Sequence, residues 1–154
     1  MGACDNELHQ SSVPSYAVNL RINTEAGEYV NFVPENMYSH MTVDDQGYHF
    51  NGKTLPVTIG SEPHGYMGTV IFINGGGEYV AYDLCCPQCY TEGLRKNSEN
   101  NKLEPLEIDG ILAKCPICGA CYDLSCYGVP QKGAKEALRQ FTTTYFNHIL
   151  TVRN

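Results

Sequence analysis

The sequence has no long apolar run and little positive charge, and each absence excludes a class of protein. No segment approaches the roughly 18 consecutive apolar residues that a membrane-spanning helix needs. The net charge is −7, and no cluster of Lys and Arg is present that could neutralise a phosphate backbone. We therefore expect neither a transmembrane helix nor binding to nucleic acid.

The sequence also lacks a recognisable catalytic motif. It contains no nucleophile–base pair, no phosphate-binding loop and no paired carboxylates of the kind that hydrolases use. A chain of 154 residues is long enough for one ordinary domain with a core of its own. We expect a single domain without enzymatic activity.

Cysteine, in contrast, is abundant, and four of the eight cysteines form two short hooks. The first hook is Cys86-Pro87-Gln88-Cys89, and the second is Cys115-Pro116-Ile117-Cys118 followed by Gly119. A proline inside each hook presets the backbone of a tight turn, and the glycine permits a positive φ. Paired hooks of this kind offer four sulfurs to one tetrahedral metal ion, so Cys86, Cys89, Cys115 and Cys118 are the expected metal ligands.

The other four cysteines allow several interpretations. Cys85, Cys121 and Cys126 are either disulfide partners or buried thiols. The segment Gly2-Ala3-Cys4 looks like the end of a bacterial lipoprotein signal, in which Cys4 would carry the lipid. The alternative is a cytoplasmic protein with an incidental early cysteine.

Hydrophobic periodicity predicts a β-rich chain. Strict alternation in Tyr16–Asn23 is typical of a half-buried strand. Asn51-Gly52 is typical of the tight turn of a hairpin. The expected strands are Tyr16–Asn23, Glu28–Val33, Gly47–Phe50, Lys53–Leu55, Thr69–Ile73, Glu78–Leu84, Gly110–Lys114, Tyr122–Leu124 and one or two strands within Thr143–Val152. Each hook then lies at the end of a strand, with an exposed loop expected over Glu92–Lys102 between them.

The order of these motifs resembles that of Rieske iron–sulfur domains over about residues 69–152. The residues that carry the resemblance are Tyr82-Asp83-Leu84-Cys85-Cys86-Pro87, Ala113–Gly119, Tyr122-Asp123-Leu124, Gly128-Val129-Pro130 and Gly133-Ala134. The resemblance implies an all-β fold, a Rieske-like antiparallel β-sandwich with a small ribbon-like subdomain that binds the metal. It also implies that the hydroxyl of Tyr122 bonds a ligand cysteine.

The departures from that family's pattern fall on the ligands themselves. A Rieske centre takes one cysteine and one histidine from each loop. Here Gln88 and Cys118 occupy the two histidine positions, and Cys89 follows one residue after the first of them. The five histidines of the chain all lie outside both hooks. The local motif therefore cannot build an ordinary Cys₂His₂ cluster.

Three chemistries remain open for the same four sulfurs. The first is a structural Zn²⁺ in a closed tetrahedron of thiolates. The second is a [2Fe–2S] cluster held by four cysteines, which would make the protein an electron carrier. The third is a metal-free envelope protein in which the hooks are closed as disulfides.

Together these patterns predict a flexible tail or tether over residues 1–15 and one Rieske-like domain over residues 16–154. The metal-binding subdomain is expected at about residues 83–130. The expected function is that of a non-enzymatic module with a Cys₄ metal centre, most simply zinc. The expected location is the bacterial cell envelope, with a redox partner or an envelope assembly as partner and membrane contact only through a lipid on Cys4.

Overall fold

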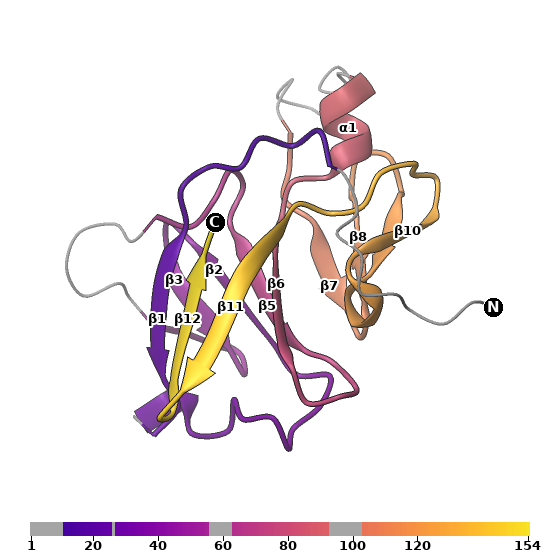
Figure 1. Ribbon diagram of the computed structural model, residues 1–154. Coiled ribbons are helices and arrows are strands. Elements are labelled where there is room, and N and C mark those ends of the chain that lie inside the picture. The colour runs from indigo at the N-terminus through magenta and orange to yellow at the C-terminus, as the bar shows by residue number, and fades with distance from the viewer. Residues whose placement is uncertain (1–10, 26, 56–62, 93–102) are drawn as a thin grey trace.

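The computed structural model describes residues 11–25, 27–55, 63–92 and 103–154, and Figure 1 shows their arrangement. Over these residues the structure is almost entirely β, with one short α-helix and two single-turn 3₁₀ helices. The elements in chain order are β1 (Asn19–Asn23), η1 (Gly27–Tyr29), β2 (His40–Asp44), β3 (Gly47–Phe50), β4 (Lys53–Leu55), β5 (Thr69–Ile73), β6 (Tyr79–Asp83), α1 (Pro87–Glu92), β7 (Glu107–Asp109), β8 (Leu112–Lys114), β9 (Cys121–Asp123), η3 (Leu124–Cys126), β10 (Val129–Lys132), β11 (Gln140–Phe146) and β12 (Ile149–Arg153). The predicted all-β class is confirmed.

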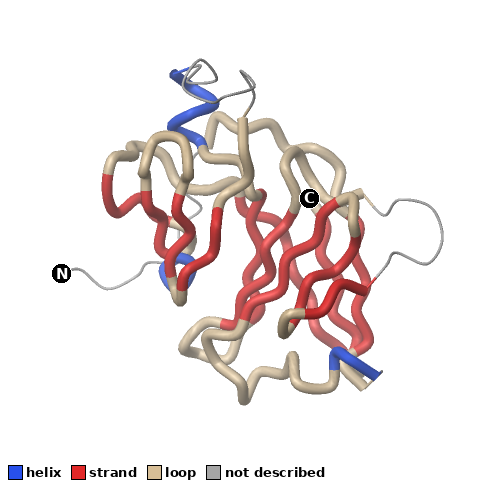
Figure 2. Tube along the Cα trace, turned by 180° about the vertical axis from the view of Figure 1, so that it is seen from behind, coloured by secondary structure: helices blue, strands red, loops and turns tan. Residues whose placement is uncertain are grey.

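Within the described ranges, the strands form two antiparallel sheets. The larger sheet has eight strands in the order β1-β12-β11-β6-β5-β2-β3-β4. The smaller has four strands in the order β10-β9-β8-β7. Figure 2 shows the small sheet set beside the large one, with helix α1 at one end of the small sheet. The antiparallel layers agree with the expected sandwich with a small added subdomain.

Tight turns join the hairpins of the large sheet. β3 and β4 pair through Asn51 and Gly52, which adopt φ values of 52° and 76°. β11 and β12 pair through Asn147 and His148, with φ values of 50° and 62°. Two successive positive φ values give a turn whose twist matches that of the strands. The predicted turn at Asn51-Gly52 is therefore confirmed.

The central strands β5 and β6 are buried along their whole length, because they separate two cores. One face of the pair contributes Ile71 and Ala81 to a core inside the curled large sheet, where Leu20 of β1 and Phe50 of β3 belong to the same cluster. The other face contributes side chains to a second core shared with the small sheet. That second core contains Val70, Phe72, Val80, Tyr82, Leu106, Ala113, Tyr122, Leu124 and Leu138, together with Cys86, Cys89 and Cys115. The hooks are thus part of the packing between the two sheets.

One expected strand is wrong. Glu28–Val33 forms no strand: its start lies in the short helix η1, and the N–H of Phe32 donates to the carbonyl of Tyr29 in a turn. Gly27 enters this segment with a φ of 44°, which starts a turn where a strand was expected. Phe32 is fully buried and packs against Phe50 and Tyr79, so this side chain fills the core, whereas Val30 of the same segment is exposed.

The packed part of the chain begins before the expected boundary at residue 16. Val13 is fully buried, and the carbonyls of Ser11 and Val13 accept hydrogen bonds from the Arg139 guanidinium at 2.7 and 2.8 Å. Residues 1–10, and with them the predicted lipid site at Cys4, lie outside the described residues, as do residues 93–102 of the expected loop between the hooks. None of the helices in the described ranges has the length and apolar character needed to cross a bilayer.

Candidate metal centre

The first hook starts where β6 leaves the large sheet. Cys86 directly precedes α1, and Pro87 takes the first helical position, where a missing N–H costs nothing. The N–H of Tyr90 donates to the carbonyl of Cys86 at 3.1 Å, which closes the first turn of the helix. Cys89 lies within this turn, and its own N–H is hydrogen-bonded to the sulfur of Cys86. The helical turn therefore directs both thiols to one side.

The second hook is a tight turn between β8 and β9. The N–H of Cys115 donates to the carbonyl of Ala120 at 2.9 Å, and the N–H of Gly119 donates back to the carbonyl of Cys115 at 3.0 Å. Gly119 has a φ of 77°, a conformation that favours glycine. The N–H groups of Ile117 and Cys118 are hydrogen-bonded to the Cys115 sulfur. The turn thus brings the thiols of Cys115 and Cys118 to the same side.

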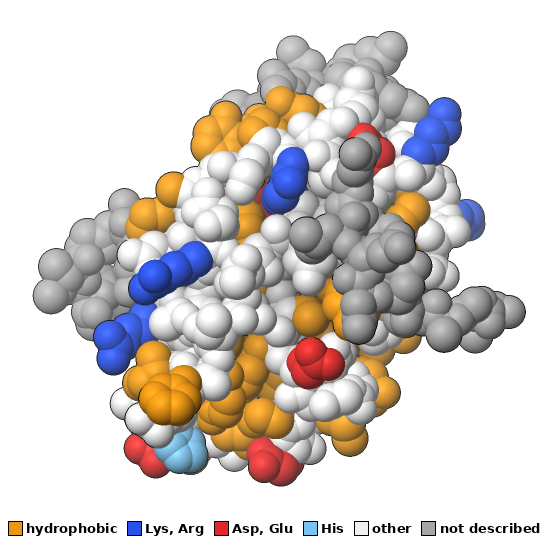
Figure 3. All heavy atoms as spheres, in the orientation of Figure 1, with side chains coloured by type: hydrophobic (Ala, Val, Ile, Leu, Met, Phe, Trp, Pro, Cys, Tyr) orange, Lys and Arg blue, Asp and Glu red, His pale blue; other side chains and the backbone are white. Residues whose placement is uncertain are grey.

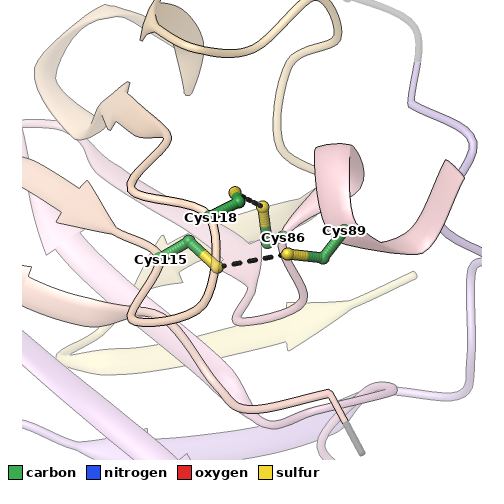
Figure 4. A group of neighbouring side chains, drawn as sticks. All are labelled: Cys86, Cys89, Cys115 and Cys118. Atoms are coloured by element: carbon green, nitrogen blue, oxygen red, sulfur yellow. Dashed lines mark hydrogen bonds between the residues drawn. The ribbon is translucent and has the colours of Figure 1, made fainter. Parts of the chain in front are cut away.

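The two hooks face each other, and their four sulfurs converge (Figure 4). The Sγ atoms of Cys89 and Cys115 are 3.4 Å apart, and those of Cys86 and Cys118 are 3.7 Å apart. All four Sγ atoms lie within 4.8 Å of one another. Cys86, Cys89 and Cys115 are buried, whereas Cys118 is partly exposed. Four sulfurs at this spacing could hold a metal.

The pKa values of three of the hook thiols differ. Hydrogen bonding to Cys86, followed by the N–H groups of Cys118 and Ile117, lowers the pKa of Cys115 to about 5 against the effect of burial. The hydrogen bond with Cys115, together with burial, raises the pKa of Cys86. Burial, followed by hydrogen bonding to Cys115 and Cys118, raises the pKa of Cys89. The thiol of Cys115 therefore ionises more readily than those of Cys86 and Cys89.

The hydroxyl of Tyr122 lies 3.1 Å from the sulfur of Cys86, as the resemblance implied. Tyr122 comes from β9 and is fully buried. Burial, and then the bond to Cys86, raises the pKa of Tyr122, so the hydroxyl keeps its proton. The backbone N–H of Gln88 donates to the same hydroxyl at 3.4 Å. A chain of donors therefore runs from the first hook through Tyr122 to the Cys86 sulfur.

The remaining cysteines differ in state. Cys85 and Cys121 are outside any disulfide, and Cys126 is disulfide-bonded. Cys85 is buried, whereas Cys121 is partly exposed and donates to the carbonyl of Gly119 at 3.6 Å. A bridge between Cys121 and Cys126, or from Cys85 to either of them, is thus not formed in this structure.

The histidines of the described ranges take no part in the cysteine group. His64 makes an isolated β-bridge with Val18, His49 contacts Asp44 at 2.8 Å and His148 contacts Glu25 at 3.4 Å. The four hook cysteines are the one group of side chains, within the described part of the chain, that is placed to bind a metal. Any metal centre here is therefore bound by sulfur.

No protein-family model matches the chain, and no curated protein matches it. Among solved structures, the chain is similar to one from the complex of reduced oxygenase and oxidised ferredoxin in carbazole 1,9a-dioxygenase. The two are 17% identical, the likeness covers 88% of this chain and 93% of that chain, and the TM-score is 0.44. A likeness at this level does not show the family.

Proposed function

We propose that this protein is a non-enzymatic module in which Cys86, Cys89, Cys115 and Cys118 hold one structural Zn²⁺. The observation that carries the proposal is the convergence of all four sulfurs within 4.8 Å. A tetrahedron of thiolates with bonds of about 2.3 Å has edges of about 3.8 Å. Two of the sulfur pairs, at 3.4 and 3.7 Å, are near this edge length. A single ion can occupy such a site with little movement of either hook.

The position of the site fits a structural role. The first hook follows β6 of the large sheet, and the second follows β8 of the small sheet. An ion shared by the hooks would tie the two sheets together at the core that they share. Four protein ligands fill a tetrahedral site, so no position remains for a substrate. This closed ligand set supports a role without catalysis.

Elemental analysis and an absorption spectrum of purified protein test the proposal together. We expect one zinc per chain, no iron and no visible bands. Replacement of zinc by Co²⁺ should give the charge-transfer and ligand-field bands of a tetrahedral tetrathiolate. A red-brown protein with iron and a reversible reduction would contradict the zinc proposal.

The second candidate is an electron carrier with a [2Fe–2S] cluster held by the same cysteines. It is favoured by the Tyr122 hydroxyl at 3.1 Å from Cys86, which would tune a potential, and by the partial exposure of Cys118. Its difficulty is geometric, because two irons must hold their cysteine pairs farther apart than one ion does. The hooks would have to separate. Iron, inorganic sulfide and a spectrum that bleaches on reduction would establish this candidate.

The third candidate leaves the site without metal and closes the hooks as disulfides. In the structure all four hook cysteines are outside disulfides, which supports a metal over this candidate. A count of reactive thiols in unfolded protein, after a chelator removes the metal, decides the question. Four thiols from the hooks support metal binding, and none supports disulfides.

We also propose that the protein works in the cell envelope with a protein partner, either a redox protein or an envelope assembly. The disulfide at Cys126 supports an oxidising compartment. On the face drawn in Figure 3, Lys and Arg side chains are scattered among other residues, which supports a partner other than nucleic acid. Cell fractionation with an antibody tests the location: envelope fractions are expected, and a purely cytoplasmic signal would contradict it.

A further inference from the structure

Asp83, the last residue of β6, is a charged side chain that is fully buried. Its carboxylate accepts three backbone hydrogen bonds. Oδ2 accepts from the N–H of Tyr66 at 2.6 Å, and Oδ1 accepts from the N–H groups of Met67 and Cys85 at 3.1 and 2.9 Å. A buried carboxylate is tolerated where donors surround it. These three donors come from two segments that are far apart in the sequence.

The first of those segments, residues 64–67, is fixed to the body of the large sheet. The N–H of Gly65 donates to the carbonyl of Ala17 at 3.0 Å, and the hydroxyl of Thr69 donates to the carbonyl of His64 at 2.8 Å. The second segment is the start of the first hook, because Cys85 directly precedes Cys86. Asp83 therefore connects a fixed turn to the backbone that carries a ligand sulfur.

The same turn also touches the far end of the first hook. The ring of Tyr66 packs edge-on against the ring of Tyr90, with centroids 5.9 Å apart and planes at 82°. Tyr90 directly follows Cys89 in α1. The turn thus supports the first hook at both ends, through Asp83 on one side and through Tyr66 on the other.

Gly65 leaves the space that this arrangement needs. A Cβ atom at Gly65 would lie 2.7 Å from Oδ2 of Asp83, and the φ of Gly65 is 86°. A side chain at this position would displace the carboxylate that joins the turn to the hook.

We infer that Asp83 is a positioning residue for the metal centre, which sets the first hook in place by binding it to the turn at residues 64–67. The inference rests on the proposed function, since it assigns Asp83 a role toward the ion that the hooks hold. It also makes a claim about the metal-free protein: the thiols of Cys86 and Cys89 stay buried because Asp83 holds their hook. That claim can be tested without any metal.

The test variant is Asp83→Asn, which keeps the shape of the side chain but points an NH₂ group at a backbone N–H. The matched control is Asp123→Asn. Asp123 also follows a tyrosine at a strand end, but its carboxylate accepts from the N–H and hydroxyl of Ser125, at 2.9 and 2.6 Å, and from no hook residue among the hydrogen bonds described. A loss of stability that follows from removing either carboxylate would affect both variants alike.

The first readout is alkylation of the metal-free protein by iodoacetamide, followed by mass spectrometry of peptides. In Asp83→Asn we expect Cys86 and Cys89 to react at least ~10-fold faster, as the loss of a charge-assisted hydrogen bond implies. Cys121, the partly exposed thiol of β9, is the internal reference and should not change. Rates for Cys86 and Cys89 equal to those of the wild type and of Asp123→Asn would overturn the inference.

The second readout is the rate at which zinc passes to a coloured chelator. A residue that orients metal ligands typically changes metal affinity by roughly 10- to 100-fold, and we expect a faster release of that order from Asp83→Asn alone. If the wild type binds no zinc, the proposed function fails, while the alkylation rates still decide the role of Asp83. If Asp83→Asn does not fold, Gly65→Ala takes its place: faster alkylation of the first hook supports the inference, and unchanged rates overturn it.

Discussion

Among single residues, Tyr122 tests whether a hydrogen bond to a ligand sulfur contributes to zinc affinity. Tyr122→Phe keeps the buried ring and removes the hydroxyl 3.1 Å from Cys86. Hydrogen bonds to charged groups contribute about 1.5–3 kcal/mol, so zinc affinity should fall by roughly 10-fold or more. Competition with a chelator of known affinity measures the change.

The matched control for that substitution is Tyr82→Phe. Tyr82 is also fully buried, and its hydroxyl donates to the carbonyl of Leu124 at 3.2 Å, away from the sulfurs. Its loss should lower the melting temperature and leave zinc affinity unchanged. Equal affinities of the two variants would contradict a specific role of Tyr122.

The pH dependence of zinc binding follows from the thiol pKa values. Cys86 and Cys89 have raised pKa values, so zinc must displace at least these two protons near neutral pH, whereas Cys115, with a pKa of about 5, is already ionised. Displaced protons make affinity rise with pH, by about 100-fold per pH unit for two protons. Calorimetric titrations at several pH values in different buffers should show this proton release. An affinity that does not change between pH 6 and 8 would contradict it.

At the residue scale, the sequence was informative because hook spacing alone specifies which sulfurs can meet. The turns of α1 and of residues 115–119 are local. The sequence alone therefore predicts that Cys86 shares a turn with Cys89, and that Cys115 shares a turn with Cys118. The role inferred for Asp83 could not be predicted in the same way. Its partners, Tyr66 and Met67, are joined to it by the pairing of β5 with β6. The signal that could have pointed to them is the glycine at position 65 beside the aromatic Tyr66.

Among the elements, the turn of the second hook can be tested by substituting its glycine, Gly119, which has a positive φ. Gly119 has a φ of 77° and no heavy atom within 4 Å of an added Cβ, so Gly119→Ala introduces backbone strain alone. The cost should be about 1–2 kcal/mol, with faster zinc release because the turn carries two ligands. Thermal unfolding and chelator-driven release measure the two effects.

The control is Gly110→Ala in the turn between β7 and β8. Gly110 has a φ of 64° and equally open surroundings, but no ligand lies in its turn. It should lose similar stability and release zinc at the wild-type rate. Zinc release that changes equally in both variants would mean that the hook turn has no special role.

Hairpins were predictable from the sequence where their turn residues are explicit, as at Asn51-Gly52. The strand expected at Glu28–Val33 is not formed, because Phe32 turns into a core while Val30 is exposed, and the segment pairs with no neighbouring strand. The short strand β7 was not anticipated, since three residues carry too little periodicity to recognise. β7 exists through its pairing with β8, in which Glu107 lies opposite Lys114. Contacts between segments that are distant in the sequence explain both the missing strand at Glu28–Val33 and the presence of β7.

For the whole molecule, the two cores predict different responses to metal removal. Cys86, Cys89 and Cys115 belong to the core between the sheets and are absent from the core within the large sheet. Removal of the metal should therefore loosen α1, β8 and β9 and leave β1 and β12 protected. Hydrogen exchange with and without a chelator measures this, with added zinc as the reversal control. Uniform loss of protection across both cores would contradict a local role of the ion.

The central claim is that one ion occupies the four sulfurs, and native mass spectrometry of the full chain tests it most directly. The account predicts a mass increase of one Zn²⁺ with a net loss of two protons, which is the charge balance of one bound divalent ion. It also predicts that Cys118→Ser weakens this species and lowers the melting temperature. A mass increase of two irons and two sulfides, or an apo mass with an unchanged melting curve for Cys118→Ser, would contradict it.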